Sequence, residues 1–293
     1  MKNTSSDLVN QFVYIVILNW NGWRDTIRCL DSLQQLDYAS SQIIVVDNGS
    51  TDESCFQIES AHPKIKLLRS DSNLGFGGGC NIGIRYALAH GADFIWLLNN
   101  DTVVQSVTLS ALVNQMHSDP YNGAVGSVLF YMHNPNAIQA WGGGYVNFLT
   151  GRSTHCFSPV DPNSLNYLTA ASMLLRKEAL EEVGIFDEKS FFMYWEDVDL
   201  CYRLRNGGWK LDVAPGAKVL HQESGSLGAK NSQLYRYYSA SVVQFFKQHS
   251  RVSFIPISIA IGGKALKMLL SGNVDLAIAT VSGLLSALGV KKT

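Results

Sequence analysis

The sequence lacks the features that mark several large classes of protein. Its five cysteines are scattered among 293 residues and none are spaced as C-x-x-C, which argues against a disulfide framework and a structural zinc site. Its 23 basic and 24 acidic side chains nearly cancel, so a nucleic-acid partner is not expected. The start, MKNTSSDLVN, has no apolar segment of the kind that directs export. We therefore expect reduced thiols and a cytoplasmic location.

Familiar catalytic motifs are missing as well. No G-x-S-x-G, H-E-x-x-H or G-K-[ST] occurs, which excludes the common serine-hydrolase, zinc-protease and P-loop signatures. The glycine loop SNLGFGGGCNIG has Cys80 or Ile82 where a dinucleotide fingerprint needs glycine. This loop either brings backbone amides near a phosphate or serves only close packing, and its residues leave both readings open.

What the sequence does contain is an alternation typical of α/β proteins. Hydrophobic residues make up 46% of the chain, enough for one large domain with an appendage. Short apolar runs at 13–18, 43–46, 65–68 and 94–98 alternate with helical periodicity, as from Trp23 to Leu33. This pattern predicts a mostly parallel central sheet with helices on both faces. Ligands of such sheets bind beyond the carboxyl ends of the strands.

Polar side chains follow each of these four runs. The positions are Asn19 and Asn21, Asp47 and Asn48, Asn73, and Asn99, Asn100 and Asp101. One such residue is usually a turn or a helix cap. Four successive strand ends with the same character predict a polar pocket at that edge of the sheet.

The second half of the chain shows no linker, and we expect it to extend the same domain. It contains WGGGY and then FFMYWEDVDLCYRLRNGGW, which places Glu196, Asp197 and Asp199 at the start of a helix. Acids in a first turn ordinarily cap the helix or interact with its dipole. We predict that Asp197 is instead a general base, since it leans inward behind aromatic residues. Burial and the helix dipole shift its pKa in opposite directions, so the sequence does not fix the sign.

Asp101 and His221 are the candidate metal ligands. Asp101 ends an apolar strand, where a carboxylate can reach a divalent cation that also binds a diphosphate. His221 ends the run AKVLH, although a single histidine there is more often structural.

The last segment, residues 254–290, differs from the rest. Its two apolar stretches are interrupted by glycines, Lys264, Lys267 and Asp275, and each is shorter than the ~20 residues of a spanning helix. We expect helices that lie on a membrane surface. Packing on the catalytic part, or across a homodimer, is the alternative.

Taken together, VYIVILNWNG, IIVVDNGSTDES, NLGFGGGCNIGI, LLNNDT, FFMYWEDVDLCYRLRNGGW and HQESGS resemble the family 2 glycosyltransferases. The resemblance covers residues 13–250 and is strongest to the bacterial rhamnosyltransferase branch. It implies the GT-A (nucleotide-diphospho-sugar transferase) fold and transfer of a sugar, with inversion, to an acceptor hydroxyl. It also implies a catalytic domain over 1–250, with a nucleotide-binding half (10–120) and an acceptor half (121–250), followed by a helical tail (251–293).

The resemblance implies a role for each group of residues. Asp197 would be the base, with Trp195 and Glu196 orienting the acceptor, and Asp101 with His221 would bind Mg²⁺ or Mn²⁺. The nucleotide-sugar would be held by Asn19, Asn21, Asp47, Asn48, Gly75, Gly77, Asn81, Asn99, Asn100 and Asp101.

The implied donor is dTDP-L-rhamnose, and the implied acceptor is a saccharide or lipid-linked saccharide of cell-surface polysaccharide synthesis. The enzyme would then be peripheral on the inner face of the membrane. Asn99 stands where the family often has the first aspartate of D-x-D, and Ser239-Ala240-Ser241 stands where Arg-Asn is common. A sugar-phosphate nucleotidyltransferase and a non-catalytic nucleotide-sugar-binding scaffold are the alternatives.

Overall fold

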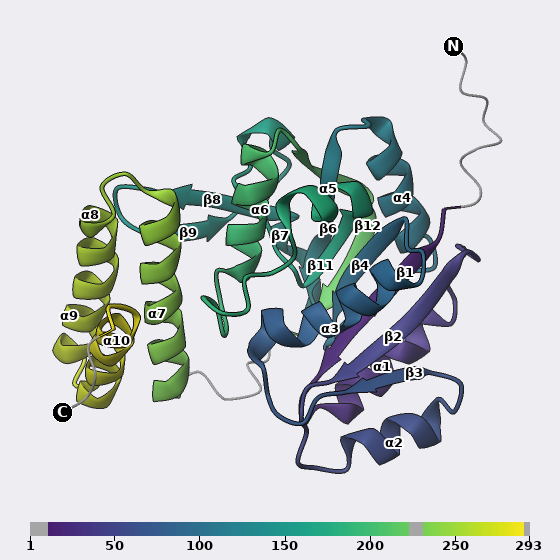
Figure 1. The fold of residues 1–293 in the computed structure, drawn as a ribbon, viewed down its shortest axis with the longest axis horizontal. Helices are drawn as coiled ribbons and strands as arrows, with labels where there is room; N and C mark the ends of the chain where they lie inside the picture. The colour runs from purple at the N-terminus through teal and green to yellow at the C-terminus, as the bar shows by residue number, and fades with distance from the viewer. Residues whose placement is uncertain (1–10, 223–230, 290–293) are drawn as a thin grey trace.

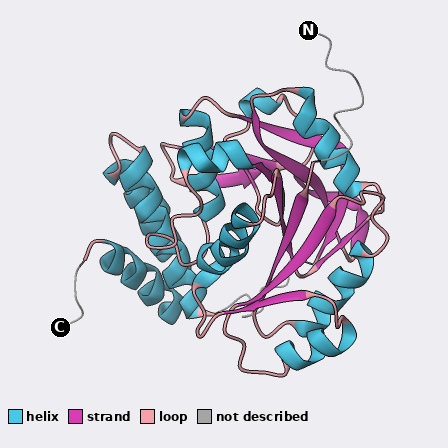
Figure 2. Cartoon of the chain, turned by 45° about the vertical axis from the view of Figure 1, so that its right-hand side comes forward, coloured by secondary structure: helices cyan, strands magenta, loops and turns pink. Residues whose placement is uncertain are grey.

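A curled central sheet forms the body of the protein (Figures 1 and 2). The computed structural model describes residues 11–222 and 231–289. Within them the sheet has nine strands, in the order β3-β2-β1-β4-β11-β6-β12-β5, with β7 paired to β6. The strands are β1 (Val13–Asn19), β2 (Ser41–Asp47), β3 (Lys66–Arg69), β4 (Phe94–Asn99), β5 (Thr102–Val104), β6 (Asn122–Tyr131), β7 (Asn134–Trp141), β11 (Ser172–Arg176) and β12 (Lys210–His221).

The first half is the predicted parallel sheet. β1 pairs in parallel with both β2 and β4, and β2 with β3. The connecting helices are α1 (Trp23–Leu33), α2 (Ser54–Ala61) and α3 (Gly75–Ala89), and α4 (Thr108–Ser118) follows β5. Because the strands are parallel, the polar residues after β1, β2 and β4 meet at one edge, as the sequence indicated.

Beyond β4 the prediction of a mostly parallel sheet needs correction. β11 runs antiparallel to both β4 and β6. β5 pairs antiparallel with β12, and β7 pairs antiparallel with β6. Only β6 and β12 add a parallel pair among the described strands of this half. Short buried apolar runs look alike in parallel and antiparallel sheets, so the sequence pattern did not reveal the reversal.

Both faces of the sheet are covered, so alternate strand residues enter different cores. Val16, Ile44 and Leu97 belong to one cluster, and Ile15, Val45 and Trp96 belong to the other. All six are at most 1% exposed. This explains the nearly continuous apolar runs from which the strands were predicted.

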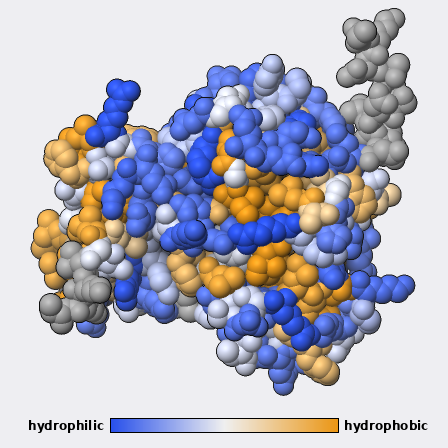
Figure 3. Space-filling view, in the orientation of Figure 1, coloured by the Kyte–Doolittle hydropathy of each residue, from blue (hydrophilic) through white to orange (hydrophobic). Residues whose placement is uncertain are grey.

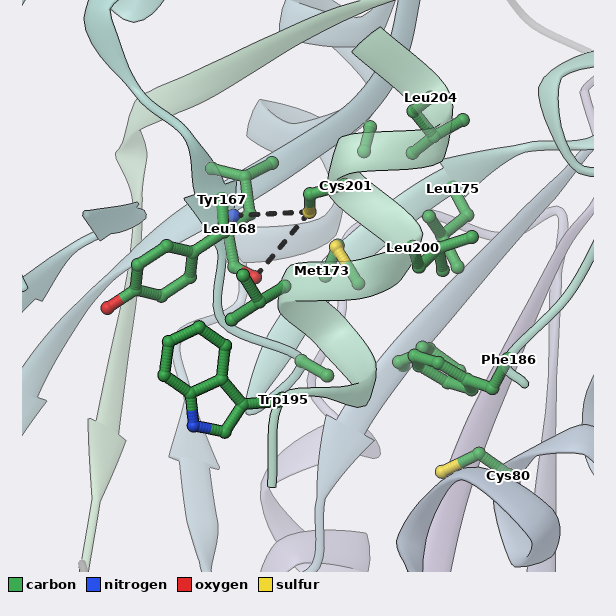
Figure 4. Close-up of a cluster of buried hydrophobic side chains, with 14 of the residues drawn as sticks. Cys80, Tyr167, Leu168, Met173, Leu175, Phe186, Trp195, Leu200, Cys201 and Leu204 are labelled. Atoms are coloured by element: carbon green, nitrogen blue, oxygen red, sulfur yellow. Dashed lines mark hydrogen bonds between the residues drawn. The ribbon is translucent and has the colours of Figure 1, made fainter. Parts of the chain in front are cut away.

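A second, three-stranded sheet stands beside the main one, with the order β10-β8-β9. Its antiparallel strands are β8 (Gly143–Asn147), β9 (Arg152–His155) and β10 (Tyr167–Leu168). A short 3-10 helix η2 (Pro162–Ser164) precedes β10, and α5 (Lys177–Val183) and α6 (Glu196–Asn206) follow β11. α6 begins at the acidic cluster, and the sulfur of Cys201 on this helix bonds both the backbone N–H (3.3 Å) and C=O (3.8 Å) of Leu168 (Figure 4).

The C-terminal helices form a separate layer at the left of Figure 1. They are α7 (Ser232–His249), α8 (Phe254–Ile257), a π-helical turn η3 (Ser258–Gly262), α9 (Gly263–Leu270) and α10 (Val274–Ala287). α10 packs closely on α7, since a Cβ on Gly283 would lie 2.3 Å from the carbonyl oxygen of Arg236. Their outer surface carries exposed apolar side chains, visible as orange patches in Figure 3. Among the residues that the structure describes, no helix has the length and apolar character needed to cross a bilayer.

We predict that Gly75→Ala destabilises the protein more than Gly91→Ala. Both glycines have positive φ, +77° and +83°, which costs an alanine about 1–2 kcal/mol. Only at Gly75 would the new Cβ meet the chain, 2.0 Å from the Phe192 carbonyl oxygen, whereas Gly91 has open space. Overpacking adds roughly 1–3 kcal/mol to the loss at Gly75. Urea denaturation of the two variants measures the difference, and equal losses would show that the Gly75–Phe192 contact is unimportant.

Candidate active site

The ends of β1 and β2 are joined by a buried polar network. The side-chain amide of Asn19 donates to Asp47 Oδ1 (2.8 Å) and to Ser50 Oγ (3.2 Å). Its oxygen accepts from the Thr26 hydroxyl at 2.8 Å, and Asp47 Oδ2 accepts from the backbone N–H of Ser50 at 3.1 Å. Asn19 is fully buried and Asp47 is 2% exposed. Asn19 therefore positions the Asp47 carboxylate, and the side-chain oxygen and nitrogen of Asn19 are both already hydrogen-bonded within the protein.

Asn21 and Asn100 flank this network nearer the surface. Asn21 has φ +52°, and its side-chain oxygen accepts from the backbone N–H of Thr51 at 2.8 Å. This bond ties the loop after β1 to the loop after β2. Asn100 donates to the Thr26 hydroxyl at 3.0 Å. Asn21 is exposed and Asn100 is half-buried, so both side chains are accessible to a ligand at this edge.

The glycine loop at the start of α3 is fastened by Asn48. The Asn48 amide donates to the Gly75 carbonyl at 2.9 Å, and its oxygen accepts from the backbone N–H of Leu74 at 3.0 Å. Gly77 lies against Phe186, where a Cβ would come within 3.1 Å of the Phe186 Cβ. The close packing of this loop on the 186–196 segment explains why glycine stands at 75 and 77. Close packing was one of the two roles that the sequence left open for this loop.

Asn81 does not fit the nucleotide-binding role expected from the sequence. It is fully buried, and its amide donates to the Phe186 carbonyl (2.9 Å) and to Glu188 (2.6 Å). Its oxygen accepts from the backbone N–H of Phe186 at 3.2 Å. With every polar atom bonded inside the protein, Asn81 anchors the 186–188 turn to α3.

Asp101 and His221 come together although 120 residues separate them. His221 Nε2 lies 3.2 Å from Asp101 Oδ1, and Asn99 Nδ2 lies 3.4 Å from the same nitrogen. His221 Nδ1 bonds Gln139 Oε1 at 2.7 Å, so the Nδ1 proton donates there and leaves the Nε2 lone pair facing the carboxylate. Asp101 Oδ1 is buried and has no hydrogen-bond donor among the residues that the structure describes.

This pair fits a divalent cation. Two lone-pair atoms that face each other need a cation or a proton between them, and a histidine held through its other nitrogen is typical of metal ligands. The described residues contain no cluster of three or more His, Cys, Asp or Glu side chains. A bound Mg²⁺ or Mn²⁺ would therefore take most of its ligands from water and a phosphorylated substrate, as Mg²⁺ commonly does.

The acid pair at the start of α6 has unequal surroundings. Asp197 Oδ2 accepts from the backbone N–H of Ala170 (3.2 Å) and Oδ1 from that of Val198 (2.8 Å). Burial nevertheless raises the pKa of Asp197 above its ordinary value. Glu196 is 6% exposed and its Oε2 has no hydrogen-bond partner in the described part of the chain. Burial together with the neighbouring Asp197 raises its pKa well above the usual range. Burial thus disfavours the charged form of Glu196, while two N–H groups orient the Asp197 carboxylate.

Two strained residues lead into α6. Tyr194 and Trp195 have φ values of +70° and +69°, a conformation that costs each residue roughly 1–3 kcal/mol. The Trp195 ring is held by Phe245 on α7, with the ring centroids 4.8 Å apart. The surrounding packing thus keeps the chain in a conformation that presents Trp195, Glu196 and Asp197 to one cavity.

That cavity has a volume of about 390 Å³. Asn99 and His221 line it together with Trp195, Glu196 and Asp197. Because His221 contacts Asp101, the cavity joins the end of β4, the candidate metal ligands and the candidate base. Asp101 and Asp197 are therefore not separated by the sheet.

The small sheet and α7 form a further side of this cavity, which the sequence pattern did not reveal. Ser153 and His155 from β9, Tyr167 from β10 and Tyr238 from α7 also line it. The available signal was the WGGGY motif, whose last two glycines, Gly143 and Gly144, lie in β8 between β9 and β10. Its bearing on the site becomes visible only when the strand pairing is known.

Comparisons with known proteins point in one direction. The family described as "Glycosyl transferase family 2" matches residues 14–184. An N-acetylglucosaminyl-diphospho-decaprenol L-rhamnosyltransferase of Mycobacterium tuberculosis is 27% identical over 250 residues, which are 76% of this chain and 80% of that protein. The dTDP-rhamnosyl transferase RfbF of Shigella flexneri is 24% identical over 216 residues, 73% of this chain and 70% of that one.

A solved structure is similar over nearly the whole chain. It is the mannosyltransferase PcManGT from Pyrobaculum calidifontis in complex with GDP-Man and Mn²⁺. It has a TM-score of 0.60 and 15% identity, and the match covers 97% of this chain and 88% of that one. At this identity the likeness shows a common fold.

We predict that Asn99→Asp and Asp101→Asn change Mn²⁺ affinity in opposite directions. An added carboxylate beside His221 should tighten binding roughly tenfold, and loss of the Asp101 charge should weaken it by at least as much, because ligand charge tunes cation affinity. Calorimetric titration with Mn²⁺ in the presence of dTDP measures both changes.

The matched control is Asp31→Asn. Asp31 also lies 3.2 Å from a histidine, His62, but neither belongs to the cavity. Mn²⁺ affinity should stay unchanged in this variant. Equal affinities in all three variants would contradict the assignment of the Asp101–His221 pair as the cation site.

Proposed function

The chain belongs to glycosyl transferase family 2 and has the GT-A fold, and on this basis we propose that it is an inverting rhamnosyltransferase. It moves L-rhamnose from dTDP-L-rhamnose to a hydroxyl of a lipid-linked saccharide in cell-surface polysaccharide synthesis. Glycosyltransferase activity follows from the family, and the names of the two rhamnosyltransferase relatives support the choice of sugar. The observation that carries the mechanism is the single cavity shared by Asn99, His221 and Asp197.

Asp197 is the general base of this reaction. The acceptor O–H gives its proton to the Asp197 carboxylate while its oxygen bonds to the anomeric carbon of the donor. The bond from that carbon to the diphosphate oxygen breaks, and the nucleoside diphosphate leaves with the bonding electrons. The N–H groups of Ala170 and Val198 keep the carboxylate oriented, and its raised pKa makes it a stronger base than an exposed aspartate.

Asp101 and His221 hold the divalent cation. When bound, Mg²⁺ or Mn²⁺ neutralises the charge that develops on the leaving diphosphate. Gln139 fixes the tautomer of His221 through the 2.7 Å contact at Nδ1, and Asn99 supplies an amide oxygen or nitrogen close to the pair without adding charge. The phosphates of the donor would supply further oxygen ligands to this cation.

The nucleoside lies at the carboxyl ends of β1 and β2. Asp47, presented by Asn19, accepts hydrogen bonds from the donor, and Asn21, Asn48 and Asn100 shape the surrounding edge. The loop of Gly75 and Gly77 closes one side through its fit against the 186–196 segment. In this division of labour, residues 10–120 bind the nucleotide, residues 121–250 bind the acceptor, and residues 251–293 form the tail.

The tail rests on the inner face of the cell membrane, where a lipid-linked acceptor would be found. Residues 251–293 contain five basic side chains and one acidic side chain, a net charge of +4 within a chain of net charge −1. Exposed apolar residues lie on the outer side of α9 and α10, including Leu266, Leu269 and Leu270. A basic, apolar helical surface binds anionic membranes.

A transfer assay tests the function. The protein is incubated with radiolabelled dTDP-rhamnose, UDP-hexoses or GDP-hexoses, Mn²⁺, and a synthetic N-acetylglucosaminyl diphospholipid with a short lipid chain. We expect EDTA-sensitive transfer from dTDP-rhamnose, with inverted anomeric configuration in the product. Release of diphosphate from a nucleoside triphosphate and a sugar phosphate would indicate a nucleotidyltransferase, and nucleotide binding without transfer would indicate a scaffold.

Within the same assay Asp197→Asn should lower kcat on the order of 10²-fold or more, because it removes the base, while nucleotide affinity stays unchanged. Activity of the unaltered enzyme should fall as the pH drops through the Asp197 pKa, which lies above the ordinary aspartate value. Glu196→Gln, which mimics the neutral acid, is the adjacent control and should lose far less activity. An equal loss in both variants would refute the assignment of Asp197 as the base.

Binding to vesicles tests the role of the tail. The double variant Leu269→Glu, Leu270→Glu should weaken binding to vesicles of anionic lipid by more than tenfold, since burying each leucine contributes about 1.5–3 kcal/mol. Phe56→Glu is the control, because Phe56 is 69% exposed on α2, outside the tail. Sedimentation with vesicles measures both variants. Unchanged vesicle binding together with loss of a homodimer would show that the surface is a dimer contact.

A further inference from the structure

The C-terminal helices contain a hollow that the transfer reaction does not use. It has a volume of about 840 Å³ and is lined by α9, α10 and Arg236 of α7. This size lies within the ~300–1,000 Å³ of pockets that hold small organic molecules. None of the residues assigned to the sugar donor, the cation or the base belongs to its lining. The hollow is therefore a candidate site for a different ligand.

Large apolar side chains form the walls of this hollow and are exposed to solvent. Ile278, Val281 and Leu285 follow one another at helical spacing on α10, and Leu269 of α9 lines the same hollow. Each of the four is between 41% and 62% exposed. A contiguous apolar patch of this kind marks a surface that another apolar group covers.

A second apolar hollow adjoins the first. It has a volume of about 600 Å³ and lies between α8, η3, α9 and α10. Ala265 and Val281 line both hollows, and Phe254, Ile257 and Leu288 are among the other walls of the second. Two adjoining apolar hollows fit a molecule with two hydrocarbon chains better than a molecule with one.

The charged side chains at these hollows are basic. Arg236 lines the first and is exposed, and Lys247 lines the second. Within the described part of the chain, no acidic side chain lines either hollow. Ser282 and Ser286, one turn apart on α10, add hydroxyl groups to the lining that contains Arg236. A guanidinium beside hydroxyls suits a phosphate group.

The first hollow lies on a different side of α7 from the catalytic cavity. Arg236 lines the hollow and Tyr238 lines the cavity. Two residues apart on an α-helix, they project to opposite sides of it. Of the residues that the structure describes, none lines both spaces. The occupant of the hollows is therefore a molecule other than the acceptor whose sugar enters the cavity.

We propose that the two hollows bind one molecule of an anionic diacyl phospholipid, with its acyl chains against α8, α9 and α10 and its phosphate on Arg236. The proposal rests on the membrane role proposed for residues 251–293. It deepens that role by naming a discrete site for a single lipid molecule, distinct from the outer surface that rests on the bilayer. It does not depend on the sugar-transfer reaction.

Calorimetric titration of the full-length protein tests the site. The probes are phosphatidylglycerols with chains short enough for the lipid to stay monomeric, so that no membrane is present. We expect one lipid to bind per protein chain. Dihexanoyl-phosphatidylglycerol should bind at least tenfold more tightly than dibutanoyl-phosphatidylglycerol, because each buried CH₂ strengthens binding by roughly fourfold.

Two variants address the phosphate and the chains separately. Arg236→Gln should weaken binding of both lipids about tenfold, since it removes a charge-assisted hydrogen bond. Ser286→Phe places a ring in the first hollow and should reduce the advantage of the longer chains. Lys267→Gln and Ser232→Phe are the matched controls, because both residues are exposed and neither lines a hollow.

Sedimentation with anionic vesicles separates the lipid site from the general membrane contact. Arg236→Gln should sediment with vesicles as Lys267→Gln does, because each variant removes one positive charge from the C-terminal helices. Melting temperatures of all four variants should stay near that of the unaltered protein. A selective loss of monomeric lipid binding in Arg236→Gln therefore reports on the site itself.

Four outcomes would overturn the site. Absence of saturable binding, or equal affinities for the two chain lengths, removes it and leaves the vesicle contact and the transferase function standing. Equal losses in Arg236→Gln and Lys267→Gln would show that Arg236 does not hold the phosphate. A homodimer that Ser286→Phe disrupts, without lipid binding, would assign the hollows to a second copy of the chain. Competition between dihexanoyl-phosphatidylglycerol and the synthetic acceptor in the transfer assay would assign them to the lipid of the acceptor.

Discussion

The backbone of two adjacent residues, Ala170 and Ala171, connects the two halves of the site. The Ala171 carbonyl accepts from the backbone N–H of Asn99 at the end of β4, and the Ala170 N–H donates to Asp197 on α6. The first bond fixes the position of the strand end that leads to Asp101, and the second fixes the carboxylate. Because both groups belong to the stretch that enters β11, the antiparallel insertion of β11 beside β4 sets the separation between the candidate cation site and the candidate base.

A second backbone contact holds the other side of the cavity. The N–H of Phe76 donates to the Phe192 carbonyl at 2.9 Å, directly beside the close approach of Gly75 to the same residue. The glycine loop of the first half and the strained turn before α6 thus share one contact. The strain at Tyr194 and Trp195 persists because this contact on one side and the aromatic packing of α7 on the other leave the turn no freedom to relax.

The sequence was a good guide wherever side-chain pattern decides the structure. The runs at 13–18 and 94–98 appear as β1 and β4 with one residue added at the carboxyl end, since strands buried on both faces have a clear signature. The pattern did not predict β11 as an antiparallel strand, the burial of Asn81, or the side of the cavity formed by the small sheet. Each of these depends on contacts between segments 23 to 105 residues apart, which no local pattern encodes.

The tail is coupled to the cavity through Lys264. Its ammonium contacts the rings of Tyr235 and Tyr238 on α7, and burial lowers its pKa to about 8. The charged form survives near neutral pH because the ring faces replace part of the water that burial removes. Tyr238 lines the cavity while Lys264 belongs to the helices with the exposed apolar surface. A shift of α9 relative to α7 therefore cannot leave Tyr238 unaffected, so the position of the C-terminal helices and the shape of the cavity are linked through one side chain.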